Sequence, residues 1–534
     1  MFWTWDRMHF PEVLTPLDAE WILDMHNKSF NVPLAALGLP MRMHGKVING
    51  YMFTSMAPIT TNMEELHTAE EQAQAKLGEA MGALGQRWDH EYLPELQRHL
   101  QRWDQFDLRA ADMPALRAHV DETVAMILRC WEIHFFVAFP MLLSISLFDE
   151  LYRDLFGNET AFDAYKLLQG IRTKSVEAGH ALWDLSRKAI AVPDVRKVME
   201  EEAASQVIPA LQRSDAGRRF LSDLHGYLGE YGQRADKFTT NAVSWIEDPT
   251  PAIKMLKDYC GRSEGNPEEE LKLLAEERDQ LIAVSRQRLA GYPQQVVGQF
   301  EFMLGAAQVG NRLQEDHNFW IDQRVMYRMR KVFLEVGRRL VDAGVIADAG
   351  DVYYLTLSEL RETIDAFPTL NRYDIVAQHK AAEKQQQALQ PPPMAGAIPP
   401  GAPPDNPMIR TMGKFWGAPP QGPTAEGVLR GNAGSPGIMR GPARIIKSIA
   451  ESGKLQPGDV LVAETTAPPW TPLFATAAAV VTDTGGILSH CAIVAREYRI
   501  PAVVGIGMAT TMLRDGQLVE VDGNAGTVRP LVTA

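Results

Sequence analysis

Apolar residues recur at steps of three and four positions through most of the chain between residues 61 and 360. This spacing places side chains on one face of an α-helix, so the stretch is predicted to be mainly helical. The run of helices is predicted to begin at a capping box formed by Thr61 and Glu64. One clear apolar series is Leu116, Val120, Val124, Ile127, Leu128 and Trp131.

Two short strands are predicted ahead of this helical stretch. Residues 41–53 have the composition of two short strands, and Asn49-Gly50 lies between them as a turn signal. Asn-Gly is the dipeptide preferred in the tight turn of a β-hairpin. The sequence therefore predicts a hairpin over residues 41–53.

The C-terminal part has a different pattern, which predicts a strand, a turn, a helix and a second strand. Residues 477–481 are small and apolar, as in a buried strand, and Gly485-Gly486 supplies a turn. Ser489 is placed as the N-cap of a helix that begins at His490. Pro501 ends this helix, and residues 502–504 form the next strand.

His490 is the strongest candidate for chemistry. At a helix N-terminus it would lie beside unpaired backbone N–H groups and the positive end of the helix dipole. This position disfavours an imidazolium and favours a phosphate. A neutral imidazole there is a nucleophile able to hold a phosphoryl group. The alternative interpretation of His490 on its own is a histidine that only caps the helix.

Residues 385–423 are predicted to be an extended linker. Eleven of the 34 prolines of the chain lie between Pro391 and Pro423, separated mainly by glycine and alanine. Such a composition is typical of a semi-extended segment with partial polyproline II structure. Composition alone leaves open whether it is a passive spacer or a tether for a domain that moves.

Composition and charge narrow the classes of function. The formal net charge of −14 argues against nucleic acid as the main partner, because phosphate backbones require basic surfaces. The three cysteines provide no disulfide framework, which fits a reducing compartment. The most apolar run, residues 135–148, is too short to span a bilayer, contains Pro140 and is predicted to be a buried helix. The N-terminus lacks the features of a signal peptide, so we expect a cytoplasmic protein with no membrane partner.

Four ordered motifs in the C-terminal part resemble the phosphohistidine domain of the PEP-utilising enzymes, the family of pyruvate phosphate dikinase and rifampin phosphotransferase. The resemblance covers about residues 427–530, and in it Cys491 and Arg499 depart from the usual residues. The motifs are residues 431–446, 455–473, 481–505 and 516–528. The resemblance implies that His490 is phosphorylated and that its domain swivels between sites, which favours the tether interpretation of the linker.

The helical region resembles the substrate-binding region of rifampin phosphotransferase and of relatives such as phenylphosphate synthase. The similar segments are residues 5–17, 49–51, 230–234, 245–249, 315–320, 336–344 and 351–356. The two resemblances imply a multidomain fold. We expect a mainly α-helical acceptor-binding domain at residues 1–384, a Pro-rich linker at 385–424 and a C-terminal α/β swivelling domain at 425–534.

The resemblance also implies a reaction and a partner. No glycine-rich phosphate loop is found in the sequence, and an ATP-grasp domain is not recognised. We therefore expect a separate ATP-grasp subunit to bind ATP and Mg²⁺ and to load His490, giving a covalent phosphohistidine, AMP and phosphate. The acceptor is expected to be a hydroxyl of a small aromatic, phenol-like molecule, and the chain to be a dikinase-type phosphotransferase.

The remaining site residues are predicted from the resemblance together with residue chemistry. Glu315 or His317 is expected to take the acceptor's proton, with Gln314 and His9 in contact with the acceptor. The group expected to contact phosphate is Gly485, Gly486, Ser489, Arg496 and Arg324. No metal ligand is assigned. The bland alternative for His317 is a hydrogen-bonded helix residue, and for Arg496 a surface ion pair.

Two other functions stay open at this point. In one, the chain is a non-catalytic phosphocarrier or regulator, and its helical region docks a protein. In the other, it is a ligase-like enzyme that uses ATP to condense two organic molecules through a phosphorylated intermediate. A small-molecule cavity beside His317 would argue against the first, and product analysis would separate the second from simple phosphorylation.

Overall fold

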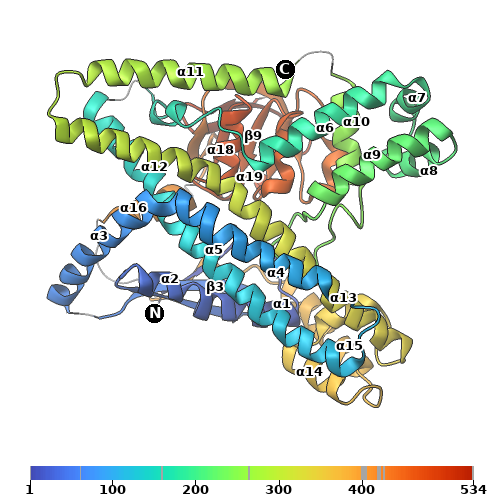
Figure 1. The fold of residues 1–534 in the computed structure, drawn as a ribbon. Coiled ribbons are helices and arrows are strands. Elements are labelled where there is room, and N and C mark those ends of the chain that lie inside the picture. The colour runs from blue at the N-terminus through green and yellow to red at the C-terminus, as the bar shows by residue number, and fades with distance from the viewer. Residues whose placement is uncertain are drawn as a thin grey trace. The chain divides into compact units, whose positions relative to one another are not determined.

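The computed structural model describes residues 2–60, 62–157, 160–262, 265–397, 406–417, 422–424 and 427–531. They form two compact units, each made of segments that are discontinuous in sequence (Figure 1). The first unit holds Met1–Pro140, Lys237–Ala242 and Trp320–Ala402. The second unit holds Met141–Asp236, Val243–Phe319 and Pro403–Ala534. One boundary falls within the predicted linker, and the others fall within the region predicted as one helical domain.

The predicted fold class is confirmed: a mainly helical region is followed by a C-terminal α/β domain. Helices and single helical turns run from α1 to α15 over the first 387 residues, interrupted by one small sheet. The second, larger sheet begins at Leu429. The periodicity of apolar residues in the sequence therefore changes from helical to strand-like where the structure changes from helices to the larger sheet.

The sheet of the first unit has four strands in the order β2-β3-β1-β4. These are β1 (Phe2–Trp5), β2 (Met41–Ile48), β3 (Tyr51–Pro58) and β4 (Met394–Gly396). The predicted hairpin is confirmed, since β2 and β3 pair from Met41↔Pro58 to Ile48↔Tyr51. Asn49 and Gly50 take the positive φ angles, 48° and 79°, that this two-residue turn requires.

The first unit also contains helices and single helical turns of very different lengths. They are α1 (Pro16–Asp24), η1 (Met25–Ser29), α2 (Asn31–Ala36), α3 (Met63–Arg87), η2 (Trp88–Tyr92), α4 (Leu93–Gln105), α13 (Met326–Asp342), η6 (Ala349–Tyr354), α14 (Leu357–Asp365) and α15 (Tyr373–Gln387). The residue that caps α3 is Asn62, whose side chain accepts the Glu64 N–H at 3.0 Å. Thr61, predicted to be the cap, lies outside the described residues.

A buried carboxylate joins the short segment 237–242 to helix α1. Asp18 is fully buried and accepts hydrogen bonds from Trp21 Nε1 at 2.8 Å and Thr15 Oγ1 at 2.9 Å. It also accepts the backbone N–H of Thr240 at 2.9 Å and its hydroxyl at 2.6 Å. A buried charge is tolerated where its hydrogen-bonding capacity is filled in this way. Asp18 therefore holds a distant piece of chain in the first unit.

The helices of the second unit begin after a long helix, α5 (Met113–Phe156), in which the boundary between units falls at Pro140. They are η3 (Ala164–Leu167), α6 (Lys174–Ala191), α7 (Pro193–Glu201), η4 (Ala204–Gln206), α8 (Val207–Leu211), α9 (Asp215–Tyr231), α10 (Thr250–Cys260), α11 (Pro267–Arg288) and α12 (Gln294–Asn318). η5 (Phe319–Val325) follows α12 directly. In Figure 1 the helices α6 to α10 form one cluster, and α11 and α12 are long separate helices.

Helix α5 is apolar enough over 18 residues, with mean hydropathy 1.6, to meet the length and composition of a membrane span. Within the protein, however, 72% of that window is buried. The expectation of a buried helix around Pro140 is confirmed, although the helix is much longer than the apolar run.

The sheet of the second unit has eight strands in the order β5-β12-β11-β7-β8-β9-β10-β6. They are β5 (Leu429–Arg430), β6 (Asn432–Ser435), β7 (Ile438–Ile445), β8 (Val460–Ala463), β9 (Ala479–Thr482), β10 (Ala502–Val504), β11 (Leu518–Asp522) and β12 (Thr527–Pro530). Four neighbouring strands, β7 to β10, are parallel, and the outer strands pair antiparallel. The short helices η7 (Ile449–Lys454), η8 (Pro468–Trp470), α17 (Thr471–Phe474), α18 (His490–Glu497) and α19 (Ala509–Met512) connect them.

The centre of this sheet is buried and, apart from Thr482 in β9, apolar. Every residue of β8, β9 and β10 is buried. Strands of a parallel sheet are covered on both faces, so a continuous apolar run is expected. The predicted strands at residues 477–481 and 502–504 are thus confirmed as β9 and β10.

The prediction of an extended linker does not hold for its described residues. Residues 394–396 form β4, which pairs with β1, and helix α16 (Pro407–Trp416) occupies the middle. Asn406 caps α16 by accepting the Ile409 N–H at 2.9 Å, and Pro407 suits its first turn. Lys414 holds the helix to α5 through Asp149 at 2.9 Å. Residues 398–405 and 418–421 of the predicted linker lie outside the described residues.

We predict that Asp18→Ala destabilises the first unit by about 2–4 kcal/mol, because it leaves the Trp21 and Thr240 donors buried without an acceptor. Thermal unfolding followed by circular dichroism measures the effect. Asp24→Ala is the matched control, since Asp24 lies on the same helix but is exposed and pairs only with Lys28. Equal melting temperatures for the two variants would show that Asp18 is dispensable.

Candidate functional site

The turn after β9 is shaped by two glycines that do different things. Gly485 has φ of 99°, a conformation that L side chains rarely adopt. Gly486 lies so close to helix α16 that a Cβ atom would be 2.2 Å from the Lys414 carbonyl oxygen. Ser489 then caps α18 by accepting the Ala492 N–H at 3.4 Å, as predicted. These features place His490 at the first position of the helix.

The imidazole of His490 is held at both ring nitrogens. Its Nδ1 lies 2.9 Å from Oε1 of Glu315, and its Nε2 lies 3.5 Å from the hydroxyl of Thr471. The side chain is 11% exposed, and the Phe474 ring approaches it edge-on. An ionised carboxylate can only accept, so in the neutral ring Nδ1 carries the proton and Nε2 carries the lone pair. Nε2 is therefore the nucleophilic atom.

Glu315 is buried and well supplied with hydrogen-bond donors. Its second oxygen, Oε2, accepts the hydroxyl of Ser175 at 2.5 Å. Burial acts to raise the pKa of Glu315, but the charge and hydrogen bond of His490, with the bond from Ser175 and the charge of His317, outweigh it. The pKa of Glu315 thus lies below its usual value, which keeps it an acceptor for His490.

The residues around Glu315 on helix α12 fix the loop that carries His490. Gln314 donates from Nε2 to the Leu488 carbonyl at 3.0 Å. Asp316 accepts the Lys174 N–H at 2.8 Å, and burial raises its pKa to about 6 against the opposing effect of that bond. The predicted residues Gln314 and Glu315 are therefore brought to His490, although Gln314 contacts the protein backbone here.

His317 is buried, and its Nδ1 lies 2.5 Å from the Leu313 carbonyl. A carbonyl oxygen only accepts, so the neutral ring carries its proton on Nδ1 and its lone pair on Nε2. His317 is thus a hydrogen-bonded helix residue, as the structural alternative given above describes. The same tautomer, with its lone pair on Nε2, is also the one that a general base needs. Its predicted role with the acceptor stays a prediction.

The residues predicted to contact phosphate organise the loop in this conformation. The N–H of Gly486 donates to the Phe415 carbonyl at 2.8 Å, and the Gly485 carbonyl accepts from Asn432 at 3.3 Å. Arg496 donates from Nη1 to the carbonyls of Gly434 and Ile487, at 2.8 and 3.0 Å. Their contact with phosphate stays a prediction, as does that of Ser489.

Two predicted residues belong to the first compact unit. His9 is 2.9 Å from the buried carboxylate of Asp6 through Nδ1, and Asp6 also faces His26 Nε2 at 3.8 Å. Burial acts to lower the pKa of His9, but the charge and hydrogen bond of Asp6 raise it above its usual value. Arg324 lies over the Trp320 ring at 4.7 Å. Their predicted roles with the acceptor and the phosphate are not tested by these contacts.

Sequence reasoning missed Ser175 and Thr471 as partners of the site. Thr471 lies in a family-like motif, so proximity to His490 was open to inference from it. Ser175 carries no local signal, because it meets Glu315 across 140 positions in the chain.

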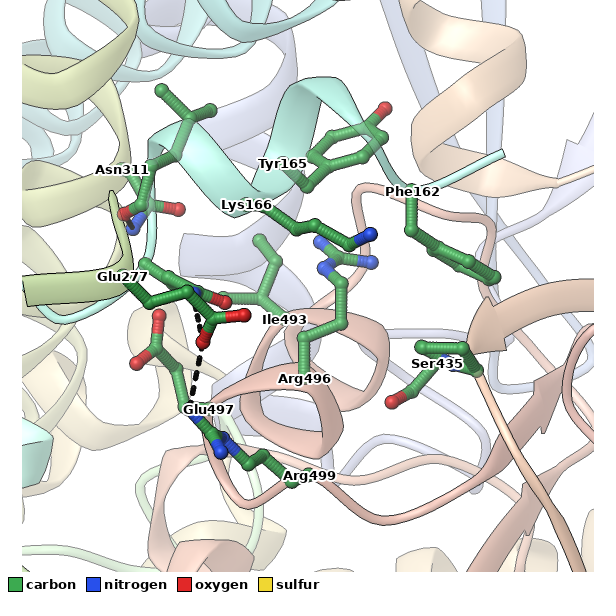
Figure 2. Close-up of a pocket in the computed structure, with 13 residues that line it drawn as sticks. Phe162, Tyr165, Lys166, Glu277, Asn311, Ser435, Ile493, Arg496, Glu497 and Arg499 are labelled. Carbon is green, nitrogen blue, oxygen red and sulfur yellow. Dashed lines mark hydrogen bonds and ion pairs between the residues drawn. The ribbon is translucent and has the colours of Figure 1, made fainter. Parts of the chain in front are cut away.

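The space beside His490 in this conformation is small. A cavity of about 20 Å³ is lined by Ser175, Glu315, Thr471 and Glu497, among others. Such a volume holds about one water molecule, so it cannot hold an aromatic acceptor. Both oxygens of Glu315 already accept hydrogen bonds, so this carboxylate is poorly suited to hold Mg²⁺ here. A larger cavity, of about 240 Å³, lies at the other end of α18 (Figure 2).

Two family models match the chain. The model described as "PEP-utilising enzyme, mobile domain" matches residues 455–526, which contain His490. The model described as "Rifampicin phosphotransferase fourth domain" matches residues 134–315, which end at Glu315. The hydrogen bond between His490 and Glu315 thus joins the segments matched by the two models.

Curated relatives extend this similarity. Chondramide synthase cmdD of Chondromyces crocatus is 37% identical over 99% of this chain and 14% of that protein. The uncharacterised phosphotransferase YvkC of Bacillus subtilis is 32% identical over 82% of the chain and 51% of that protein. Rifampicin phosphotransferase of the same organism is 26% identical over 66% of the chain and 39% of that protein. The chain spans about half the length, or less, of these relatives.

We predict that Glu315→Gln slows chemical phosphorylation of His490 by phosphoramidate at least about tenfold, since a neutral partner stabilises the positive charge formed on the ring less well. The rate is measured by mass spectrometry of the peptide that contains His490. Glu301→Gln is the control, because Glu301 lies on the same helix and pairs with Arg286 on the surface. Equal rates in wild type and Glu315→Gln would contradict the assigned role.

Proposed function

We propose that the chain carries a phosphoryl group on His490, because the family model described as "PEP-utilising enzyme, mobile domain" matches residues 455–526, which contain this histidine. It then transfers the group to a hydroxyl of a small aromatic molecule. The observation that carries this proposal is the bond between His490 Nδ1 and Glu315, which leaves Nε2 as the nucleophile. The whole reaction converts ATP, acceptor and water into AMP, phosphate and phosphorylated acceptor.

In the first half-reaction Nε2 of His490 forms a bond to the β-phosphorus of ATP while the bond from that phosphorus to the AMP oxygen breaks. Water then attacks the γ-phosphorus and the bond between the β–γ bridging oxygen and that phosphorus breaks, which releases phosphate and leaves one phosphoryl group on the ring. The phosphorylated ring carries a positive charge, and once His490 is back at the helical region its Nδ1–H is again directed at Glu315. An ionised carboxylate in a buried site stabilises such a charge strongly, because the effective dielectric constant is lower than in water. The protein supplies this stabilisation from a group that is already in place before the reaction.

In the second half-reaction the acceptor oxygen attacks phosphorus, and the electron pair of the N–P bond returns to Nε2. The acceptor's proton passes to a base on the protein. Glu315 is committed to His490 and Ser175 in this conformation. We therefore assign the base to His317, whose neutral tautomer has its lone pair on Nε2.

We place the nucleotide site on a module outside these 534 residues, such as a separate ATP-grasp subunit. The support is that the sequence carries no glycine-rich phosphate loop. Mg²⁺ bound there with ATP would neutralise the charge of the phosphates. To meet that module, His490 leaves Glu315, and the Gln314–Leu488 bond breaks with it. We assign the reaction to the cytoplasm.

An aromatic hydroxyl is our choice of acceptor for two reasons. One relative is named for phosphorylating rifampicin, and the first unit is rich in aromatic side chains near His9, including Phe238 with ring centroids 5.5 Å apart. Aromatic rings offer apolar contact area to a planar ligand. His9 and Gln314 keep their proposed roles as contacts of the acceptor, and Arg324 its role in holding phosphate.

We predict that His490→Ala abolishes both labelling by β-³²P-ATP in the presence of the nucleotide-binding module and phosphorylation of a phenol acceptor. The label on wild type is expected to be stable in base and lost in acid, as for a phosphorus–nitrogen bond. His225→Ala, an exposed histidine on α9, is the control and should behave as wild type. Label retained on His490→Ala would mean that another residue is the nucleophile.

We also predict that residues 1–534 alone form no AMP from ATP and that adding the nucleotide-binding module restores AMP formation and labelling. Chromatography of nucleotides after incubation measures this. Robust AMP formation by the chain alone would place a nucleotide site within it and would overturn this part of the proposal.

A further inference from the structure

A cavity in the second unit lies at the end of α18 opposite His490. Its volume is about 240 Å³ (Figure 2). Tyr165 and Lys166 of η3 and Glu277 of α11 line one side. Ser435 of β6 and Arg496 of α18 line the other. The cavity is therefore enclosed jointly by the helices and by the domain that carries His490.

Positive charge dominates one part of this cavity. Figure 2 shows the ends of the Lys166 and Arg496 side chains directed into the same region. Arg496 contacts two backbone carbonyls and the Tyr165 ring, at 4.5 Å from its centroid, and no described carboxylate lies within ion-pair distance of it. Burial lowers the pKa of Arg496, against the opposing effect of nearby groups such as Tyr165 and Glu497. Two adjacent cations in a chain of net charge −14 attract a small anion.

The acidic residues compensate this charge only in part, since Lys166 pairs with Asp163 at 3.3 Å but Arg496 has no such partner among the described residues. Glu277 is already paired with Arg499 at 2.8 Å. Glu497 accepts the Gly170 N–H at 3.4 Å, and burial raises its pKa to about 7. Near neutral pH, therefore, a large fraction of Glu497 carries no charge.

Size and apolar lining restrict the ligand further. The volume lies below the range of about 300–1,000 Å³ that is typical of sites for drug-sized ligands, so a nucleotide does not fit. Phe162, Leu168 and Ile493 add apolar surface beside the charged groups. An oxyanion group attached to a small apolar body complements both features.

The geometry points to a binding site for a small organic anion, a carboxylate or phosphate monoester with a compact aromatic body. Its oxyanion group lies between Lys166 and Arg496, and its ring lies against the apolar lining. The distance along α18 separates this site from the nucleophile, because eight residues of helix span about 12 Å. The ligand is thus neither the phosphoryl donor nor the acceptor in the reaction of His490.

Occupation of the site would hold the phosphohistidine domain against helices η3, α11 and α12. A ligand that binds only one arrangement of the protein stabilises that arrangement, and the stabilisation grows with the concentration of the ligand. This consequence rests on the proposed function, in which the domain moves, whereas binding itself does not. The bound anion then disfavours the separation of His490 from Glu315.

The test is direct binding of benzoate to the whole chain, measured by isothermal titration calorimetry, with inorganic phosphate as the probe of the oxyanion group alone. Lys166→Met should weaken benzoate binding about tenfold or more, since it removes a charged donor. Lys188→Met is the matched control: Lys188 is exposed on α6 and pairs with Asp223, as Lys166 pairs with Asp163. Absence of benzoate binding, or equal affinity of Lys166→Met and wild type, overturns the proposal.

A His490→Ala variant separates this proposal from the proposed function. It should bind benzoate with wild-type affinity although it cannot carry phosphate. Hydrogen exchange of residues 160–171 and 490–499 should slow when benzoate is added to wild type and should not slow in Lys166→Met. Loss of benzoate binding in His490→Ala would move the ligand to the nucleophile and overturn the separate site.

The pH dependence of binding provides a second check. The charged groups facing Glu497 are Arg278 from α11, Glu315 from α12, and Arg496 on its own helix. Glu497 gains a negative charge as the pH rises through about 7, so benzoate affinity should fall several-fold between pH 6 and 8. Glu497→Gln should remove this dependence while keeping the low-pH affinity. Unchanged pH dependence in Glu497→Gln would contradict the assigned geometry.

Discussion

The hydrogen bond between Glu315 and His490 is the interaction on which the site depends. It selects one tautomer of the imidazole, so a single nitrogen, Nε2, carries the lone pair. It also ties helix α12 to the first position of α18. Because Glu315 is buried and holds Ser175 as well, its orientation is fixed before any substrate arrives. A carboxylate held in place in this way stabilises a positive charge on the ring more strongly than a flexible surface carboxylate would, since nothing has to reorganise when the charge develops.

Burying Glu315 is possible only because its donors come from two directions. An isolated buried carboxylate would bind a proton and could no longer stabilise a charged ring. Ser175 fills one oxygen and His490 fills the other. If His490 leaves, Glu315 loses its main compensating partner, so the departure carries a free-energy cost in the helical scaffold. The docked arrangement is therefore favoured by the scaffold as well as by the moving domain.

Local patterns in the sequence were sufficient for the elements that carry the nucleophile. The order of β9, the glycine turn, Ser489 and α18 follows from short-range rules of backbone geometry and capping, and Gly485 has the predicted unusual φ. The hairpin at Asn49-Gly50 follows from the same kind of rule. Strand β4 and helix α16 were not predicted, because the high proline content of this segment indicated an extended linker. Both elements depend on contacts with residues far away in the sequence, namely the pairing of β4 with β1 and the ion pair of α16 with Asp149. The Ser175–Glu315 contact was beyond reach for the same reason.

The two ends of helix α18 move together. A helix of eight residues whose first turn is capped by Ser489 moves as a rigid rod, because bending it would break backbone hydrogen bonds. If the helix leaves as a unit, His490 separates from Glu315 while Arg496 and Glu497, at the other end, separate from Tyr165 and Gly170. Any group that strengthens contacts at the far end therefore lowers the population in which the nucleophile is released, without touching the reacting atoms. Under the proposed function, a ligand at the far end of α18 thus affects His490 without a conformational change inside the helix, by changing how often the whole helix is docked.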